Sequence, residues 1–326
     1  MAGKIKTVFF ASDAIALPLL AWLAGEGSAL AEIAAVYTQP DRPAGRGQQV
    51  RPNEIKAWAL ARGLPVRQPE KLTEAERTEF AAGAPDLGLV MAYGHILTEA
   101  FIAVPRLGLL NFHASLLPKY RGASPIQTAV ASGETETGVT LMRIVRRLDA
   151  GPTADEERAP IGALDTAREV EARLAAACVP LLVRALPRLI RGELAFRAQD
   201  DGCATYCRRL EKKDGELDFA APAATLAARI NGLFPWPGGT VEIAGQGVRL
   251  GQADALPAGA PAAPGTVVGA DAEGLLVATG RGTLRLRRLQ RPGGRMLAAT
   301  EFLLGFPVAP GTVLASRPMS DLRVGR

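Results

Sequence analysis

The first 190 residues alternate short apolar runs with longer helical patterns, and this alternation restricts the fold more than any other feature of the chain. Strands that alternate with helices form a mainly parallel sheet with helices packed on its faces. We therefore expect an α/β, Rossmann-like domain over residues 1–196. Its strands are expected over 4–10, 31–37, 87–91, 109–113 and 139–145. Its helices are expected over 14–24, 53–62, 73–82 and 166–191, with caps at Asn53 and Thr73, and with the last helix bent or split at Pro180 and Pro187.

Beyond residue 213, short segments punctuated by glycine replace this pattern. A short strand over 217–219 and a helix over 224–230 are expected first. Further strands are expected over 240–244, 248–250, 265–268, 275–279 and 284–289. Many short strands of this kind are typical of a small β-barrel. We predict that a polar linker over 197–213 joins the first domain to this second domain, which covers 214–326.

Two polar side chains end the apolar run 109–113. Side chains two residues apart on a strand share a face, so Asn111 and His113 are expected to project together. An amide can donate a hydrogen bond to a developing oxyanion, and an imidazole can carry a proton near neutral pH. Asp149 follows in the turn-prone sequence Leu-Asp-Ala-Gly-Pro, where it can orient the imidazole. We predict that these three residues are catalytic, whereas an Asn-x-His pair taken alone is more often a satisfied polar pair.

The excess of positive charge lies in the C-terminal third of the chain. Residues 207–326 contain 15 Lys+Arg against 10 Asp+Glu, whereas the rest of the chain is balanced. In the run 283–289 leucines alternate with arginines, which gives one apolar face and one basic face. We expect Arg285 and Arg287 to contact phosphates of a nucleic acid. A basic domain that is merely soluble is the alternative.

Residues 39–51 are expected to form a mobile basic loop. The segment contains two prolines, two glycines and three arginines, with almost no apolar residue. It is either a surface loop without a partner or a finger whose arginines meet nucleic-acid phosphates or base edges.

Several classes of protein are disfavoured by the sequence. Three cysteines at irregular spacing do not form a disulfide framework or a zinc site, and no other metal site is expected. No Gly-x-Gly-x-x-Gly motif follows the first strand, which argues against a nicotinamide cofactor. The N-terminus resembles a signal peptide, but Asp13 interrupts its apolar run, so a strand and a capped helix are expected instead. No membrane span is expected.

Six stretches together resemble the methionyl-tRNA formyltransferase family. They are the run Asn-Phe-His-Ala-Ser-Leu-Leu-Pro at 111–118, Arg-Gly-Ala-Ser-Pro-Ile-Gln at 121–127, Glu-Thr-Gly-Val-Thr at 136–140, Leu-Asp-Ala-Gly-Pro at 148–152, the segment 38–47 and Phe-Pro-Trp-Pro-Gly at 234–238. The asparagine, histidine and aspartate in these motifs are shared by enzymes that use 10-formyltetrahydrofolate as a formyl donor. The last two stretches narrow the resemblance to the tRNA enzyme.

The resemblance implies formyl transfer from 10-formyltetrahydrofolate to the α-amino group of methionine on initiator tRNA. It also implies a cytoplasmic monomer whose second domain is similar to an OB-fold. The tRNA contacts would come from Arg42 and Arg46. Folate would be bound by the loop Ser115, Leu116, Leu117 and Pro118, mainly through backbone groups, and by the segment that contains Tyr93 and Gly94.

This chain departs from the family's pattern at three positions, where it has Ala11, Ala14 and His95 in place of the usual glycine, proline and apolar residue. His95 is expected to be a loop residue without a catalytic role. Two other classes of function stay open. One is a folate-dependent formyltransferase that acts on a small amine, such as a nucleotide-sugar or a purine precursor. The other is an RNA-binding protein of the same fold without catalytic activity.

Overall fold

The computed structural model describes residues 4–44, 49–259 and 261–325, which form two compact units. The first unit comprises Met1–Arg121, Gly138–Ala159 and Ala172–Ala204. The second comprises Gly122–Thr137, Pro160–Glu171 and Thr205–Arg326. The chain therefore crosses between the units several times. The predicted domain limits at 196 and 214 stay a prediction.

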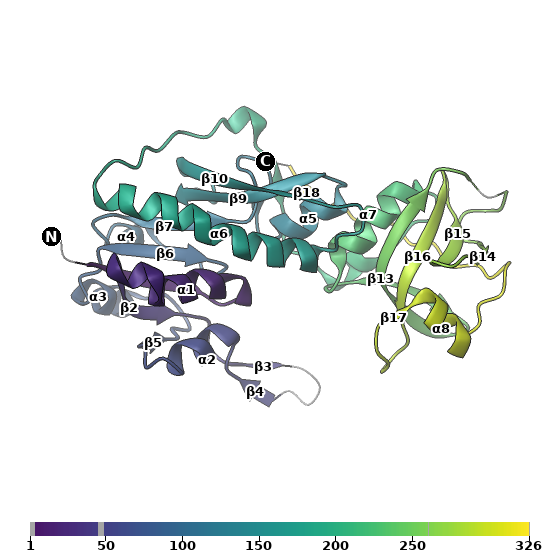
Figure 1. Ribbon diagram of the computed structural model, residues 1–326, viewed down its shortest axis with the longest axis horizontal. Helices are drawn as coiled ribbons and strands as arrows, with labels where there is room; N and C mark the ends of the chain where they lie inside the picture. The colour runs from purple at the N-terminus through teal and green to yellow at the C-terminus, as the bar shows by residue number, and fades with distance from the viewer. Residues whose placement is uncertain (1–3, 45–48, 260, 326) are drawn as a thin grey trace. The chain divides into compact units, whose positions relative to one another are not determined.

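A seven-stranded sheet organises the first unit (Figure 1). Adjacent strands from β2 through β1 and β6 to β7 run parallel, and β9 is antiparallel to β7. The predicted mainly parallel sheet is thus confirmed. Its order is β10 (Thr153–Pro160), β9 (Glu136–Arg143), β7 (Leu109–His113), β6 (Leu87–Met91), β1 (Ile5–Ala11), β2 (Ala31–Tyr37) and β5 (Val66–Arg67).

Helices cover both faces of this sheet. In Figure 1, α1 (Leu17–Ala24) and α6 (Ala167–Ile190) lie in front of the strands. On the other face, Phe80 of α3 (Glu74–Ala82) and Phe101 of α4 (Glu99–Ile102) join an aromatic cluster around Phe10 of β1. This packing holds the ends of the strands, and so the loops that follow them, in fixed positions.

The predicted helix caps are confirmed. The Asn53 side chain accepts a hydrogen bond from the backbone N–H of Lys56 at the start of α2 (Glu54–Leu60). Thr73 does the same for α3 through the backbone N–H of Glu76. The expected helix over 14–24 begins instead as a 3-10 turn, Ala14–Ala16, which Asp13 caps before α1 starts.

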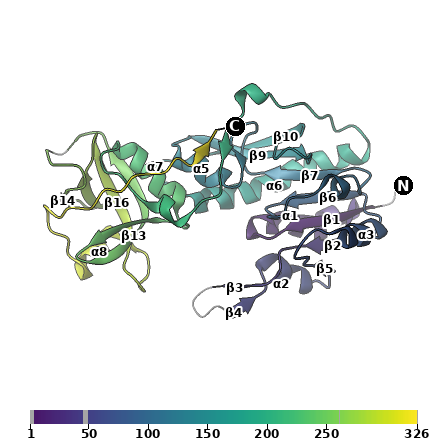
Figure 2. The same ribbon diagram turned by 180° about the vertical axis from the view of Figure 1, so that it is seen from behind.

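Three expectations about elements of the chain are corrected. The helix α6 is a single element that contains both Pro180 and Pro187, so the expected split does not occur; the leucines that it buries offset the hydrogen bonds lost at the two prolines. The expected loop over 39–51 contains a hairpin of β3 (Arg42–Ala44) and β4 (Gln49–Arg51), which projects beside α2 (Figure 2). The segment 197–213, expected to be irregular, contains β11 (Tyr206–Cys207), which pairs with β18 (Arg323–Val324), and two 3-10 turns, Asp201–Cys203 and Lys212–Gly215, while its role as a linker stays a prediction.

The second unit contains a curled antiparallel sheet of the half-barrel type, as the expected small β-barrel requires. Its strands are β12 (Gly239–Ile243), β13 (Gln246–Leu256), β16 (Thr283–Gln290), β15 (Leu275–Ala278), β14 (Val267–Ala270) and, paired with β16, β17 (Leu297–Ala298). The helix α7 (Ala223–Leu233) and the helix α8 (Ala299–Gly305) contribute Leu226, Ile230 and Phe302 to the core that the sheet encloses. Residues 217–219 are not a strand, although Leu217 and Phe219 are buried in this core. The unit also includes β8 (Arg121–Gly122) in part and α5 (Pro125–Ala131).

Over the ranges of the chain that the structure describes, no helix combines the length and the apolar character needed to cross a membrane.

Candidate active site

The two polar residues at the end of β7 lie between neighbouring strands. Asn111 is in register with Val90 of β6 and Met142 of β9, and His113 is in register with Thr140 of β9. Asn111 is partly exposed, and its side-chain amide makes no hydrogen bond to the residues that the structure describes. This amide can therefore donate to a bound substrate.

The His113 ring is only 5% exposed and has a polar group near each of its nitrogens. Nε2 lies 2.9 Å from the backbone oxygen of Tyr120, and Nδ1 lies 3.7 Å from Oδ2 of Asp149. A carbonyl oxygen only accepts hydrogen bonds, so Nε2 carries a proton and donates it to Tyr120. The nitrogen that can gain or lose a proton is consequently Nδ1, which faces the carboxylate. The distance to Asp149 is that of an ion pair and is too long for a hydrogen bond.

Asp149 lies in a tight loop after β9. Its backbone is in the left-handed region with φ of 49°, and its side chain is 12% exposed. The loop closes on itself through a 2.9 Å hydrogen bond from the backbone N–H of Arg143 to the oxygen of Pro152. Gly151 is required here, because a Cβ at this position would lie 1.9 Å from the oxygen of Arg143. The loop geometry thus turns the carboxylate toward His113.

The loop 115–118, predicted to bind folate, is fastened to β9 by one hydroxyl group. Thr140 Oγ1 donates to the backbone oxygen of Ser115 at 2.7 Å and accepts from the N–H of Leu117 at 3.0 Å. The Ser115 hydroxyl donates to the oxygen of Lys119 at 2.6 Å, so it too is committed within the loop. Leu116, Leu117 and Pro118 are partly exposed. Any polar contact of this loop with a ligand would come from the backbone.

The second predicted folate segment follows β6 and meets the loops after β1 and β2. The backbone oxygen of Tyr93 accepts hydrogen bonds from Ser12 Oγ at 2.8 Å and from Gln39 Nε2 at 3.3 Å. The Tyr93 ring is 2% exposed and packs against Phe10, and burial raises the pKa of its hydroxyl. Gly94 has a positive φ of 82°. A ligand at this end of the sheet would therefore meet the backbone of 93–94 and not the Tyr93 ring.

The three positions that depart from the family's pattern are accommodated by the fold. Ala11 is fully buried as the last residue of β1, and Ala14 begins the 3-10 turn. The His95 ring contacts the edge of Tyr93, with 5.2 Å between the ring centres. Within the described residues, its buried Nε2 has no hydrogen-bond partner.

The predicted nucleic-acid contacts differ in their surroundings. Arg42 lies on the exposed β3 strand, whereas Arg46 lies outside the described residues. Arg285 and Arg287 are mostly buried on β16 and are paired with carboxylates: Arg285 lies 2.6 Å from Asp254 and 3.1 Å from Asp271, and Arg287 lies 3.3 Å from Asp254 and 3.1 Å from Glu273. Hydrogen bonding to Asp254 raises the pKa of the Arg285 guanidinium. Three acids thus balance two arginines on this face.

Sequence reasoning missed three residues that hold the site together, namely Thr140, Arg121 and Gln199. Thr140 and Arg121 stand in motifs that carried the resemblance, but their spacing does not show what their side chains contact. Gln199 was assigned to the linker. A single glutamine in a polar segment has no periodicity, so no pattern of the sequence indicates its role.

Comparison with known proteins identifies the class of this chain. Residues 6–186 match the family described as Formyl transferase, and residues 209–307 match the family described as Formyl transferase, C-terminal domain. The chain therefore belongs to the formyl transferase family, and Asn111, His113 and Asp149 all lie within the first match.

Relatives among characterised proteins narrow the class. The chain is 42% identical to the methionyl-tRNA formyltransferase of Aromatoleum aromaticum over 311 residues, which cover 95% of this chain and 97% of that one. It is 46% identical to the methionyl-tRNA formyltransferase of Pseudomonas paraeruginosa over 269 residues, or 82% of this chain and 86% of that one. Within the formyl transferases, the chain belongs to the methionyl-tRNA formyltransferase family.

Solved structures show the same fold at much lower identity. One is the N-formyltransferase of Helicobacter canadensis in complex with folinic acid and dTDP-3-aminofucose, with a TM-score of 0.65, 18% identity and coverage of 88% of this chain and all of that one. Another is glycinamide ribonucleotide transformylase 1 of Symbiobacterium toebii, with a TM-score of 0.51, 19% identity and coverage of 61% of this chain and 96% of that one.

Proposed function

We propose that this protein transfers a formyl group from 10-formyltetrahydrofolate to the α-amino group of methionyl-initiator tRNA. The observation that carries the proposal is the juxtaposition of Asn111, His113 and Asp149 at the end of β7, in a chain that aligns with methionyl-tRNA formyltransferases over 95% of its length.

Each of the three side chains has a role in the proposed reaction. The neutral α-amino group attacks the formyl carbon, and Asn111 donates a hydrogen bond to the oxygen as it becomes negative, which is worth about 3–4 kcal/mol. The amine proton passes to Nδ1 of His113, whose charged form the Asp149 carboxylate stabilises. Collapse of the tetrahedral intermediate breaks the bond to folate N10, which receives the proton. The step balances without a metal ion or a covalent enzyme intermediate.

Backbone groups support the assignment of the folate site. The loop 115–118 and the segment 93–94 both lie at the ends of strands of the same sheet, where open α/β sheets bind ligands. The Ser115 hydroxyl is committed within its own loop and the Tyr93 ring is buried, so backbone carbonyl and N–H groups would bind the pterin. The protein is proposed to act as a monomer.

For the acceptor, Arg42 on the β3–β4 hairpin and Arg46, which lies outside the described residues, are proposed to contact the tRNA. Arg285 and Arg287 would contact phosphates only by exchanging their present carboxylate partners, which makes them the weaker part of the proposal. A protein that formylates initiator tRNA would act in the cytoplasm, where translation begins.

The test is the reaction itself. Purified protein is mixed with 10-formyltetrahydrofolate and either initiator or elongator methionyl-tRNA, and formylmethionine is counted. Formylation of the initiator alone is the expected result. Consumption of the folate with a small amine, but with neither tRNA, would indicate a small-amine formyltransferase. Tight tRNA binding without turnover on any acceptor would indicate a non-catalytic RNA-binding protein.

A further inference from the structure

We propose that Gln199 is a positioning residue for formyl transfer, because it holds the loop that presents Asp149 to His113. The inference rests on the proposed function and adds to it a residue outside the region where the chemistry takes place. It concerns a segment that we name the strap, residues 196–201, which follows α6 and runs along the Asp149 loop.

The Gln199 amide binds that loop at two points. Its Nε2 donates to the backbone oxygen of Asp149 at 2.8 Å and to that of Gly151 at 2.7 Å. Its Oε1 accepts from Nε of Arg121 at 3.0 Å and from Nη2 of Arg121 at 2.7 Å. Both donors and both acceptor positions of the side chain are used, so the amide is fully satisfied.

The chemistry of the partners fixes the orientation of this amide. A guanidinium only donates and a backbone carbonyl only accepts, so the oxygen must face Arg121 and the nitrogen must face the loop. A glutamate of the same shape would keep its attraction to Arg121. It would, however, place an anionic oxygen against two carbonyl oxygens and lose both hydrogen bonds to the loop. Position 199 therefore requires an amide, and a negative charge does not replace it.

Arg121 anchors the glutamine from the other side. The arginine side chain is fully buried, and its Nη2 lies 2.9 Å from Oδ1 of Asp201. A buried guanidinium is stable only when it is paired, so Arg121, Gln199 and Asp201 form one connected set. Asp201 also pairs with Arg147, which lies in the Asp149 loop itself. The strap thus contacts the loop through Arg147 as well as through two of its carbonyls.

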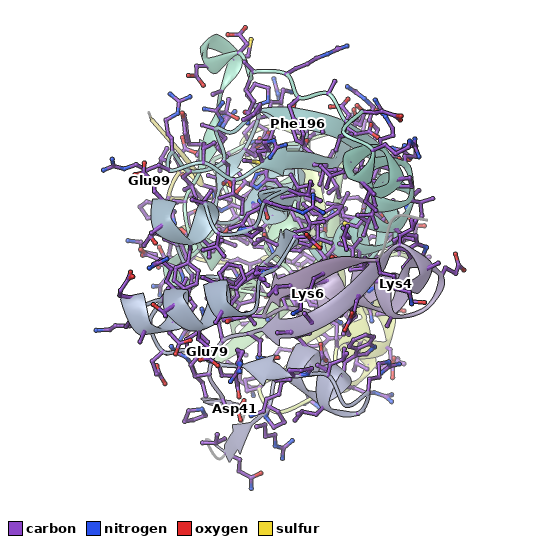
Figure 3. The ribbon with its side chains drawn as sticks, turned by 90° about the vertical axis from the view of Figure 1, so that its left-hand side faces the viewer. Lys4, Lys6, Asp41, Glu79, Glu99 and Phe196 are labelled. Carbon is purple, nitrogen blue, oxygen red and sulfur yellow. The ribbon has the colours of Figure 1, made fainter. Side chains whose placement is uncertain are left out.

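Two further contacts seat the strap. The Arg143 guanidinium lies over the Phe196 ring, with 4.2 Å from its central carbon to the ring centre. Arg197 and Thr153, the first residue of β10, exchange backbone hydrogen bonds of 2.8 Å in both directions. Figure 3 labels Phe196 beside the strands of this side of the sheet, well away from Asp41 near the hairpin. The strap therefore contacts both ends of the loop, at Arg143 and Thr153, and Gln199 binds the middle of the loop at Asp149 and Gly151.

The loop needs this support because Asp149 has a left-handed backbone, which a residue other than glycine adopts at a cost. Hydrogen bonds to the carbonyls of 149 and 151 fix the peptide planes on both sides of Ala150. Release of those carbonyls would let the turn relax, and the Asp149 carboxylate would move away from Nδ1 of His113. A displacement of about 1 Å at a reacting group can cost roughly 100-fold in rate.

The experiment compares Gln199→Glu with the unaltered protein. We expect kcat for formyl transfer to fall roughly 10- to 100-fold, with the KM for methionyl-tRNA changed less than about twofold, because the strap acts on the chemical step. Gln199→Asn keeps a neutral amide but is one methylene shorter, and its kcat is also expected to fall. This variant replaces Gln199→Glu in the test if the glutamate variant does not fold. The matched control is Gln252→Glu. The Gln252 amide donates to the oxygen of Leu164, and both residues belong to the second unit, so this variant should retain the original kcat.

A double-mutant cycle separates positioning from general structural damage. In an Asp149→Asn background, Gln199→Glu should lower kcat by less than about a further twofold. The side chain at position 149, which Gln199 positions, has already lost its charge in that background. Equal losses in both backgrounds, or full activity of both Gln199 variants, would overturn the inference while leaving the proposed function intact. Absence of formyl transfer by the unaltered protein would instead remove the proposed function.

Discussion

At the scale of single residues, the site depends on which nitrogen of His113 is committed. The carbonyl of Tyr120 accepts the hydrogen bond from Nε2, so in the proposed reaction the proton would be taken up and released at Nδ1, beside the Asp149 carboxylate. The histidine therefore cannot act as a relay from one ring nitrogen to the other without breaking its bond to Tyr120. Asn111, by contrast, has an amide that is not used within the described fold.

Replacing Asn111 by alanine removes the proposed oxyanion donor. We expect kcat to fall about 100- to 1,000-fold, as for loss of one such donor, while the Kd for methionyl-tRNA changes little. Single-turnover formylation measures the first quantity and filter binding the second. Unchanged turnover would show that the formyl oxygen is stabilised by another group.

At the scale of elements, β9 supports the site through one hydroxyl. Thr140→Val removes the hydrogen bonds of Thr140 to both Ser115 and Leu117 without changing the shape of the side chain. We expect a loss of about 1–3 kcal/mol in the free energy of unfolding, because a buried carbonyl and a partly buried N–H lose their partner. The KM for 10-formyltetrahydrofolate should rise.

The matched control is Thr7→Val on β1. The Thr7 hydroxyl is also fully buried, but it has no hydrogen-bond partner among the described residues. Its replacement should leave stability unchanged or raise it, since an unsatisfied polar group is removed. Urea unfolding of both variants, together with folate titrations of activity, makes the comparison. Equal effects of the two substitutions would contradict the role given to Thr140.

The 3-10 turn Lys212–Gly215 provides a prediction about pH. Burial alone would raise the pKa of the Asp214 carboxyl, but hydrogen bonds from Arg208 and from the backbone N–H of Glu211 outweigh burial and hold this pKa below its ordinary value. Stability from a lowered pKa is present above the unfolded-state pKa of about 3.9 and is lost as pH falls through the folded-state value.

Asp214→Asn should therefore lower the free energy of unfolding by about 1–3 kcal/mol at pH 7, and the gap from the original protein should narrow below about pH 4. Urea unfolding at pH 7 and pH 3.5 measures both. Glu242→Gln, at an exposed position of β12, is the control and should show no such gap. A difference that stays constant with pH would mean that the carboxylate charge is not what stabilises the turn.

The elements show how far the sequence predicts this fold. Apolar runs located the central strands and side-chain caps located α2 and α3, because both signals are local. The sequence predicted a long helix at α6 but left open whether Pro180 and Pro187 split it, since burial of its leucines decides that outcome. It singled out Asn111, His113 and Asp149, and the structure brings His113 within 3.7 Å of Asp149, whereas the role of Gln199 depends on contacts 50 residues away along the chain.

At the scale of the whole molecule, the basic side chains differ in whether their positive charge is already paired with an acid. The C-terminal third holds the excess of basic residues, yet Arg285 and Arg287 of β16 are balanced by Asp254 on the neighbouring strand β13 and by Asp271 and Glu273 between β14 and β15. A count of charges along the sequence therefore overstates the positive potential of this face.

Binding of initiator tRNA should weaken steeply as salt rises, because phosphate contacts release counterions. Arg42→Ala is expected to lower affinity and to reduce the slope of log K against log salt by about one contact. Arg285→Ala should change that slope less, since its charge is already paired with Asp254. The slopes come from filter binding at several salt concentrations, and a larger change at Arg285 would show that the pairing is released on tRNA binding.

The position of Gln199 in the chain also determines when during synthesis the site can be completed. A ribosome adds Asn111, His113 and Asp149 long before it adds the glutamine that lies 50 residues beyond Asp149. A growing polypeptide thus contains all three proposed catalytic side chains before it contains the glutamine that positions Asp149. The chain would therefore become catalytically competent late in synthesis, when the strap, which takes no part in the chemistry, has been added.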